Sequence, residues 1–306
     1  MLLIFLFCLP SLFLGTKVEL IIGENKTLSG RREFEFKDKH FHWLAKLVKE
    51  KTGIALSDQK QDLVYGRLVR RLRKLNLDNF DQYCKFLKND TKDELVEFVN
   101  SITTNLTSFY REPHHFEYLS NTVLRYLFNV RQREKRLRIW SAGCSTGEEP
   151  YTIAMTVLET APNINNWDIK ILATDIDTNV LEKARQGIYR MDKATGLSKQ
   201  HLQKWFLKSK NNQWPEEIKV SPRLQELITF KQLNLMEEWP MKGKFDILFC
   251  RNVVIYFDKD TQRVLFERYA NILKDDGYMF LGHSESLYKV TDKFTLLGKT
   301  IHKKAA

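Results

Sequence analysis

A short glycine-containing segment, Gly143-Cys-Ser-Thr-Gly-Glu-Glu149, carries residues that could bind a charged ligand. It follows an apolar stretch expected to be a strand and precedes an apolar helix, the place where a doubly wound sheet binds its ligand. Its glycines are spaced G-x-x-x-G, so the G-x-G-x-x-G fingerprint of dinucleotide enzymes is not met. Glu148 and Glu149 suit the dipole of a helix start but would repel a diphosphate. The loop therefore favours a ligand with an ammonium group; a plain turn with helix-capping acids is the alternative.

A further acidic residue, Asp175, closes the next apolar segment, Ile169–Ala173. A carboxylate at that place can accept hydrogen bonds from both hydroxyls of a ribose. The loop, the acid pair and Asp175, taken in this order, describe S-adenosylmethionine better than a nicotinamide dinucleotide. The alternative is that Asp175 caps the helix that follows it.

The apolar segment Phe245–Cys250 leads directly into Arg251, Asn252 and Tyr256. We expect a buried strand there, and substrates lie at the carboxyl edge of such a sheet. An arginine that leaves so apolar a strand is expected in the site, or else in a buried ion pair with an acid such as Asp175. Enzymes that methylate nucleobase amines usually present an Asn/Asp-Pro-Pro-aromatic run here. The Arg-Asn-Val run of this chain argues against an exocyclic base amine as the acceptor.

Polar residues also precede the expected sheet domain, in the run Thr103-Thr-Asn-Leu-Thr-Ser-Phe-Tyr-Arg-Glu112. Asn105 and Thr107 offer an amide and a hydroxyl group, and Arg111 offers a fixed positive charge. Taken alone, the run is typical of a capped helix end with a surface arginine.

Two kinds of periodicity indicate the elements that must position these residues. Apolar residues at helical spacing predict a small helical domain without strands over residues 31–127. Strands and helices then alternate over 128–306, which predicts an open parallel sheet with helices on both faces. A polar stretch at about 190–227 breaks the alternation and is interpreted as an inserted subdomain. The expected strands are Leu137–Ala142, Ile169–Ala173, Ile228–Leu233, Phe245–Cys250 and Tyr278–Gly282, with a helix over Thr261–Leu273.

Composition limits the class of protein. The 306 residues are 43% hydrophobic and 12% aromatic, which excludes a disordered chain and provides enough apolar residues for two domains. The four cysteines are scattered and form no CxxC pair, which excludes a disulfide scaffold and gives no sign of a zinc site. The net charge of +11 indicates an anionic partner. Residues 31–138 carry 23 basic and 15 acidic groups, so most of the excess belongs to the helical domain.

The most ordered part of that charge is a stripe on the helix expected around residues 63–75. Arg67, Arg70, Arg71 and Lys74 stand at i, i+3, i+4 and i+7, so they share one face. The stripe would dock an acidic helix bundle, or bind the phosphates of a nucleic acid, or simply be a solvated face. Tyr65 is the only nearby aromatic residue, and stacking aromatics are expected in a nucleic-acid site, so an acidic protein is favoured.

The first thirty residues stand apart from both domains. Met1–Leu14 is apolar, but it is short for a membrane span and contains Pro10. It lacks the positive start and the small-residue cleavage site of a secretory signal. We leave residues 1–30 unassigned, as either an unstructured start or a targeting segment.

In combination, the motifs of this chain resemble those of the chemotaxis receptor methyltransferase (CheR) family. The resemblance runs from about Phe41 to His302. The segments that carry it are Tyr65-Gly-Arg-Leu-Val-Arg-Arg-Leu-Arg73, Thr104-Asn-Leu-Thr107, Phe109-Tyr-Arg-Glu112, Trp140-Ser-Ala-Gly-Cys-Ser-Thr-Gly-Glu-Glu-Pro-Tyr151, Ala173-Thr-Asp-Ile-Asp177, Cys250-Arg-Asn-Val-Val-Ile-Tyr-Phe257 and Gly282-His-Ser-Glu285.

The resemblance implies a fold, an activity and a set of site residues. The fold is an all-α N-terminal domain before a Rossmann-like S-adenosylmethionine domain that carries a small inserted β-subdomain. The activity is O-methylation of glutamate side chains on the cytoplasmic helices of chemoreceptors, by a cytoplasmic enzyme with no stable membrane insertion. The implied cofactor contacts are Asn105, Thr107, Arg111, Glu149 or else Glu148, Asp175, Asn234, Leu235, Arg251 and Asn252.

The implied chemistry is methyl transfer from a sulfonium to a carboxylate oxygen, with S-adenosylhomocysteine as the product. A glutamate is already ionised at neutral pH, so no general base is needed. No metal is expected either. Arg111 would orient the acceptor carboxylate, and Tyr256 would position it by a hydrogen bond. A nucleic-acid methyltransferase and a non-catalytic scaffold that binds S-adenosylmethionine are the competing hypotheses.

Overall fold

The computed structural model describes residues 32–89, 93–161, 164–208 and 216–305. The apolar start, residues 1–30, lies outside the described residues. Contacts between residues divide the chain into a first unit, residues 1–33, and a second unit, Phe34–Ala306. The fold reported below is that of the second unit.

The helical part begins with four helices that enclose a core of their own. They are α1 (Asp38–Thr52), α2 (Gln61–Leu75), α3 (Phe80–Asn89) and α4 (Asp93–Ile102). Their apolar faces meet around Phe41, Leu68, Leu72 and Phe98, all fully buried. Helix α1 is capped at its C-terminal end by Gly53, whose φ of 77° lies in the left-handed region that favours glycine.

The sheet follows the predicted alternation over most of its width. Strands β1 (Arg136–Ala142), β2 (Asp168–Asp175), β6 (Ile228–Gln232), β7 (Phe245–Cys250) and β8 (Leu273–Leu281) run parallel in the order β6-β2-β1-β7-β8. All five overlap the segments predicted from the apolar runs. The reversal of strand order beside β1 places the carboxyl ends of β1, β2 and β7 around one crevice, the usual ligand site of such sheets.

One edge of the sheet differs from the prediction. Strands β9 (Phe294–Gly298) and β10 (Ile301–Lys304) add an antiparallel pair next to β8, so the sheet is mixed rather than fully parallel. Neither strand was predicted. Leu296 and Leu297 of β9 are exposed, so this edge strand lacks the continuous apolar signal of a buried parallel strand.

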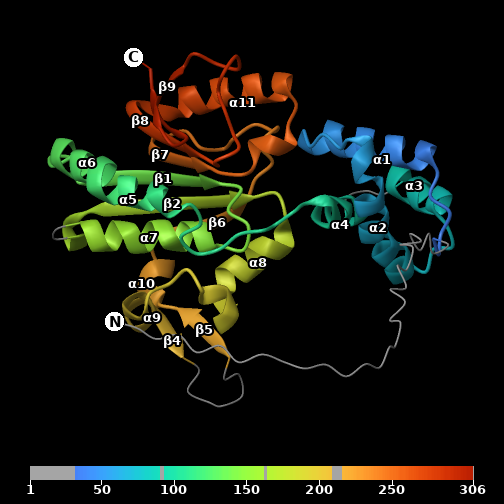
Figure 1. The fold of residues 1–306 in the computed structure, drawn as a ribbon, viewed down its shortest axis with the longest axis horizontal. Helices are drawn as coiled ribbons and strands as arrows, with labels where there is room; N and C mark the ends of the chain where they lie inside the picture. Colours follow the sequence, from blue (N-terminus) through green and yellow to red (C-terminus); the bar gives the residue numbers. More distant parts are fainter. Residues whose placement is uncertain (1–31, 90–92, 162–163, 209–215, 306) are drawn as a thin grey trace, which may run out of the picture. The chain divides into compact units, whose positions relative to one another are not determined.

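Helices cover both faces of the sheet (Figure 1). On one face lie α5 (Pro113–Tyr118), α6 (Arg125–Val130) and α7 (Glu148–Thr160), with a π-helical turn, Leu119–Leu124, joining the first two. On the other face lies α11 (Lys259–Ile272), whose Leu265, Phe266 and Tyr269 pack against β1 and β7. Helix α8 (Thr178–Gln186) follows β2 and contacts β6.

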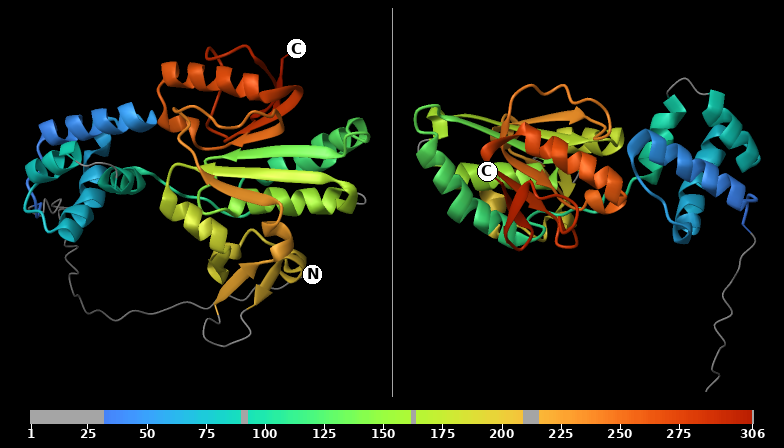
Figure 2. Two further views of the ribbon diagram at one scale, coloured as in Figure 1. Left: turned by 180° about the vertical axis from the view of Figure 1, so that it is seen from behind. Right: turned by 90° about the horizontal axis from the view of Figure 1, so that it is seen from above.

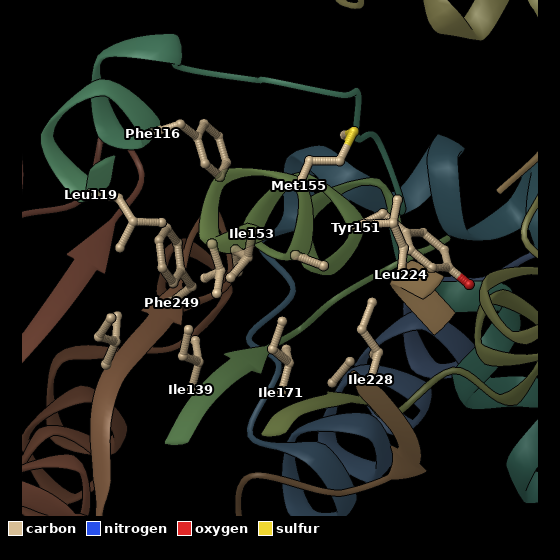
Figure 3. Packing of buried hydrophobic residues seen from close by; sticks show 14 of the residues in the cluster. Phe116, Leu119, Ile139, Tyr151, Ile153, Met155, Ile171, Leu224, Ile228 and Phe249 are labelled. Atoms are coloured by element: carbon tan, nitrogen blue, oxygen red, sulfur yellow. The ribbon is translucent and has the colours of Figure 1, made fainter. Parts of the chain in front are cut away.

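Figure 3 shows how the first of these faces is filled. Ile139, Ile171 and Phe249 project from three neighbouring strands towards Ile153 of α7 and Phe116 of α5. The apolar residues of α5 and α6 thus belong to the core of the sheet. Our predicted boundary at residue 127 groups these two helices with the first four, whereas their packing joins them to the strands.

The inserted segment forms a small sheet of its own (Figure 2). Its antiparallel strands, in the order β3-β5-β4, are β3 (Ile188–Arg190), β4 (Phe206–Lys208) and β5 (Glu217–Val220). Helix α9 (Lys199–Trp205) lies between β3 and β4 in the chain, and α10 (Pro222–Gln225) follows β5. The predicted combination of an all-α domain, a Rossmann-like sheet and a small β-subdomain is confirmed.

Within the residues that the structure describes, no helix is both long enough and apolar enough to span a lipid bilayer.

Candidate functional site

A cavity with about 1150 Å³ of empty space, open mouth included, lies at the carboxyl ends of β1, β2 and β7. That is ample room for a nucleoside-sized ligand. Helices α1 and α2 and their connection contribute Thr52, Ile54 and Leu63, so the helical part closes one side of it. The predicted site residues that line it are Asn105, Thr107, Arg111, Glu149, Asp175, Asn234, Leu235, Arg251, Asn252 and Tyr256.

The loop after β1 takes its shape from backbone conformations that few side chains allow. Gly143 has a φ of 82°, and a Cβ atom added there would stand 2.3 Å from Cγ2 of Val253. Its N–H donates to the carbonyl of Thr174, 2.8 Å away, which ties the loop to the end of β2. The glycine therefore allows the segments after β1 and β7 to approach each other at the cavity.

Asp175 faces the cavity from the end of β2 and is fixed by backbone groups. One carboxylate oxygen accepts from the N–H of Ser145 at 2.8 Å, and the other from the N–H of Asp177 at 3.0 Å. Burial raises the pKa of Asp175 to about 6. The helix that follows is capped by Asp177, whose Oδ1 accepts from the N–H of Asn179 at 2.9 Å. The capping role considered for Asp175 thus belongs to its neighbour.

The two glutamates at the start of α7 point to different places. Glu149 lines the cavity, where its carboxylate accepts from Ser141 Oγ at 2.7 Å and from Arg251 Nη1 at 3.0 Å. Glu148 does not line it and instead accepts from Thr146 Oγ1 at 2.6 Å. Burial raises the pKa of both carboxyl groups. Of the pair, Glu149 is the one placed to meet a ligand.

Arg251 lies between two acidic side chains and is almost fully buried. Its Nη1 bonds Glu149, its Nη2 stands 3.4 Å from Oε2 of Glu112, and Nη2 also donates to the carbonyl of Arg111. The sequence left open a site role or a buried ion pair with Asp175. The structure places Arg251 in the cavity wall and pairs it with Glu149 and Glu112 instead.

The segment before the sheet domain is fastened to the sheet by Asp177. Its Oδ2 accepts from Thr103 Oγ1 and from Asn105 Nδ2, each at 2.7 Å. The residue after Asn105, Leu106, is 77% exposed although it lines the cavity. Arg111 is half-buried and donates from Nη1 to the carbonyl of Leu106 at 2.7 Å, so its guanidinium lies beside that exposed leucine.

Sequence reasoning gave no role to Glu285, although it lies in one of the quoted motifs. Its carboxylate accepts from the backbone N–H groups of Asn252, Val253 and Val254, each at 2.9 Å. The N–H of Gly282 also donates to it, at 2.6 Å. Burial raises its pKa. This side chain holds the loop that carries Asn252 and Tyr256, and an acid four residues after a strand was the only available signal.

The predicted four-residue basic stripe on α2 is wrong as an exposed surface. Arg71 is buried and pairs with Glu94 and Glu97 of α4, the latter at 2.7 Å. Arg67 donates to the carbonyls of Ile102 and Thr103. Arg71 lies only about 60° around the helix from the buried Leu68, close enough to be drawn into the contact between helices. Arg70 and Lys74 are the members of the stripe that stay exposed.

A cluster of possible metal ligands lies near the cavity. Glu112, His114 and His115 bring ligand atoms within 4.8 Å of one another. The guanidinium of Arg251, 3.4 Å from Glu112, would repel a cation bound there. The expected independence from metals stays a prediction.

Two family models match the chain. One, described as "CheR methyltransferase, SAM binding domain", matches residues 105–303, and the other, "CheR methyltransferase, all-alpha domain", matches residues 39–103. The chain belongs to the CheR methyltransferase family. As a CheR protein it binds S-adenosylmethionine. The cavity suits that cofactor because two buried acids, Glu149 and Asp175, line it, and the cofactor carries an ammonium group and ribose hydroxyls.

Curated relatives of this CheR protein cover most of its length. The Chemotaxis protein methyltransferase of Escherichia coli is 44% identical over 272 residues, which are 87% of this chain and 90% of that one. The Salmonella typhimurium protein of the same name gives the same identity and coverage. Chemotaxis protein methyltransferase 2 of Pseudomonas aeruginosa is 40% identical, over 90% of this chain and 96% of its own.

Proposed function

We propose that this CheR protein transfers the methyl group of S-adenosylmethionine to glutamate side chains on the cytoplasmic helices of chemoreceptors. The observation that carries the proposal is that Arg111 and Tyr256 line the same cavity as Glu149 and Asp175. One cavity thus offers acids for a cationic cofactor together with an arginine for an anionic acceptor. The names of the curated relatives support chemotaxis as the setting.

The cofactor's charged groups match the charges of the wall. Glu149 would accept from the ammonium of the methionyl part, and Arg251 beside it is a further proposed contact of the cofactor. Asp175 would accept from the ribose hydroxyls, as carboxylates do at the end of the second strand in such folds. Asn105, Thr107, Asn234, Leu235 and Asn252 complete the proposed contacts.

On the acceptor side, Arg111 orients the glutamate and Tyr256 positions it. Lys60 adds a second positive charge, since its Nζ lies 5.4 Å from the centre of the Tyr256 ring. A carboxylate oxygen donates its electron pair to the methyl carbon, an O–C bond forms, and the S–C bond breaks to leave neutral S-adenosylhomocysteine. No proton moves, because the acceptor is ionised at neutral pH. The protein's contribution is orientation, worth up to about 7–11 kcal/mol in well-aligned reactions.

The proposed partner is an acidic helical bundle, and the enzyme is proposed to meet it in the cytoplasm. Leu63 of α2 is 44% exposed and lines the cavity, as does the exposed Leu106. Arg70 and Lys74 continue from Leu63 along the same helix and would steer an acidic partner towards the mouth.

The test is transfer of radiolabelled methyl groups to membranes that contain chemoreceptors, with RNA in a parallel reaction. We expect protein label that alkali releases as methanol, as a methyl ester requires. Arg111→Ala should lower the rate of transfer at least tenfold, whereas the exposed Arg133→Ala serves as the matched control. Label in RNA, or protein label that resists alkali, contradicts the proposal.

A further inference from the structure

Glu112 lies behind the cavity wall and no part of the proposed reaction uses it. Its side chain is about 10% exposed, and its Oε2 stands 3.4 Å from Nη2 of Arg251. Among the described residues no hydrogen-bond donor meets this oxygen, so it is an ion-pair partner alone. Burying a carboxylate oxygen is costly unless an opposite charge lies beside it.

The position of Glu112 is fixed from two sides. Its backbone has a φ of 58°, a left-handed conformation that is strained for a residue with a side chain. Its other oxygen, Oε1, accepts from the N–H of His283 at 3.1 Å and lies 3.0 Å from His283 Nδ1. The backbone N–H of His283 and the charge of Arg251 lower the pKa of Glu112 against the opposing effect of burial. It is therefore anionic at neutral pH.

The charged side chains around Arg251 do not cancel one another. When both carboxyl groups are ionised, Glu149 and Glu112 contribute two negative charges and Arg251 one positive charge, all from buried or nearly buried groups. His115, whose Nδ1 lies 3.3 Å from Glu112, adds none at neutral pH, because burial lowers its pKa to about 4. One negative charge is left over, and Glu149, the member of the cluster that lines the cavity beside Arg251, is where a ligand's ammonium can meet it.

We propose that Glu112 is a positioning residue that keeps Arg251 partly neutralised, so that Glu149 stays available to the amino group of the ligand. Without the charge of Glu112, Arg251 pairs with Glu149 alone and cancels its charge. The ammonium of the cofactor then meets a neutral pair instead of a free carboxylate. The inference rests on the proposed assignment of Glu149 to that ammonium.

The experiment compares two ligands that differ in the amino-acid part. S-adenosylhomocysteine carries it, whereas 5′-methylthioadenosine has the same nucleoside and thioether without it. Glu112→Gln keeps the size of the side chain and an acceptor for His283 but removes the charge. We expect its affinity for S-adenosylhomocysteine, measured by titration calorimetry, to fall about tenfold or more, with affinity for 5′-methylthioadenosine unchanged.

Controls separate this role from simple structural damage. Glu134 is exposed and pairs with Lys274 away from the cavity. The control variant Glu134→Gln makes the same change of charge there and should change neither affinity. If Glu112→Gln fails to fold, Glu112→Asp keeps the charge but withdraws it from Arg251, and a smaller loss confined to S-adenosylhomocysteine is expected. Equal loss of both ligands, or loss of neither, overturns the inference.

A variant of Glu149 separates the role of Glu112 from the assignment of Glu149 to the ammonium group. Glu149→Gln should weaken S-adenosylhomocysteine and spare 5′-methylthioadenosine. If it does so while Glu112→Gln has no effect, the role of Glu112 alone is refuted. If Glu149→Gln has no effect either, the proposed ammonium site is wrong.

Discussion

Four carboxylates in and around the cavity have two different roles. Asp175 and Glu149 face the space where a ligand would bind, whereas Asp177 and Glu285 hold backbone segments in place. All four are buried, but of the four only Asp175 and Glu149 line the cavity. Burial raises the pKa of Asp175 to about 6.

Cofactor affinity should therefore depend on pH through Asp175. Its pKa is raised to about 6, and only the ionised form accepts from both ribose hydroxyls. Affinity should be flat above about pH 7 and fall as the pH drops through 6, by about tenfold at pH 5. Calorimetric titration with S-adenosylhomocysteine across this range measures it. Asp175→Asn should bind weakly and without this pH dependence, and an unchanged profile in that variant would refute the role of Asp175.

Glu285 should matter for stability as much as for activity. Its Oε2 alone accepts from the N–H groups of Asn252 and Gly282. In Glu285→Gln one amide NH2 must face these donors, so at least one buried N–H loses its partner. We expect a loss of about 1.5–3 kcal/mol in the free energy of unfolding, read from urea denaturation, together with reduced methyl transfer. Full stability in this variant would show that the loop does not depend on the carboxylate.

At the scale of elements, α2 combines a structural face with a docking face. Arg71 is paired inside the helical core, whereas Arg70 and Lys74 are exposed. Arg71→Ala should destabilise the protein by about 3–5 kcal/mol, because it leaves the buried carboxylate of Glu94 without its positively charged partner. Thermal unfolding of the variant measures this, and a change below about 1 kcal/mol would contradict it.

The exposed pair should behave in the opposite way. Arg70→Glu combined with Lys74→Glu should leave the melting temperature unchanged but raise the KM for receptor membranes and flatten its dependence on salt. Arg71→Ala on the same helix is the comparison, because that variant is expected to lower the stability. A double variant with an unchanged KM would remove α2 from the docking surface.

The elements that could be predicted are those with a strong local signal. Strand β7 is buried at every position and apolar at all but Asp246, and its predicted bounds, Phe245–Cys250, agree with the structure. Strand β9 has four exposed residues out of five and a bulge against β10, so alternation was too weak to identify it. The stripe on α2 failed because helical spacing shows which residues share a face but not which edge of that face a neighbouring helix covers.

The residues of the candidate site also divide into those with a signal in the local sequence and those without one. Strand ends and glycine spacing indicated Glu149, Asp175 and Arg251 from the sequence. The pairing of Arg251 with Glu112 joins residues 139 positions apart in the chain, and Glu285 acts through backbone N–H groups. Neither contact leaves a pattern in local sequence, because it depends on how loops meet in three dimensions.

At the scale of the whole second unit, the cavity draws residues from both matched domains. Thr52, Ile54 and Leu63 come from the all-α part, and Ala55 N–H donates to the carbonyl of Tyr256 at 2.8 Å. Ligand binding should thus slow hydrogen exchange over residues 52–63 as well as in the loop 143–149. Mass spectrometry with and without S-adenosylhomocysteine measures it. Protection confined to residues after 105 would contradict a shared cavity.

The central claim is that the acceptor is a glutamate side chain. The most direct measurement is peptide mapping of a chemoreceptor after incubation with this protein and S-adenosylmethionine that carries a deuterated methyl group. We expect the labelled methyl group on glutamate side chains within the receptor's cytoplasmic helices, and we expect mild alkali to remove it. Label on lysine, arginine or cysteine, or a receptor left unlabelled by an enzyme that binds the cofactor, would contradict it.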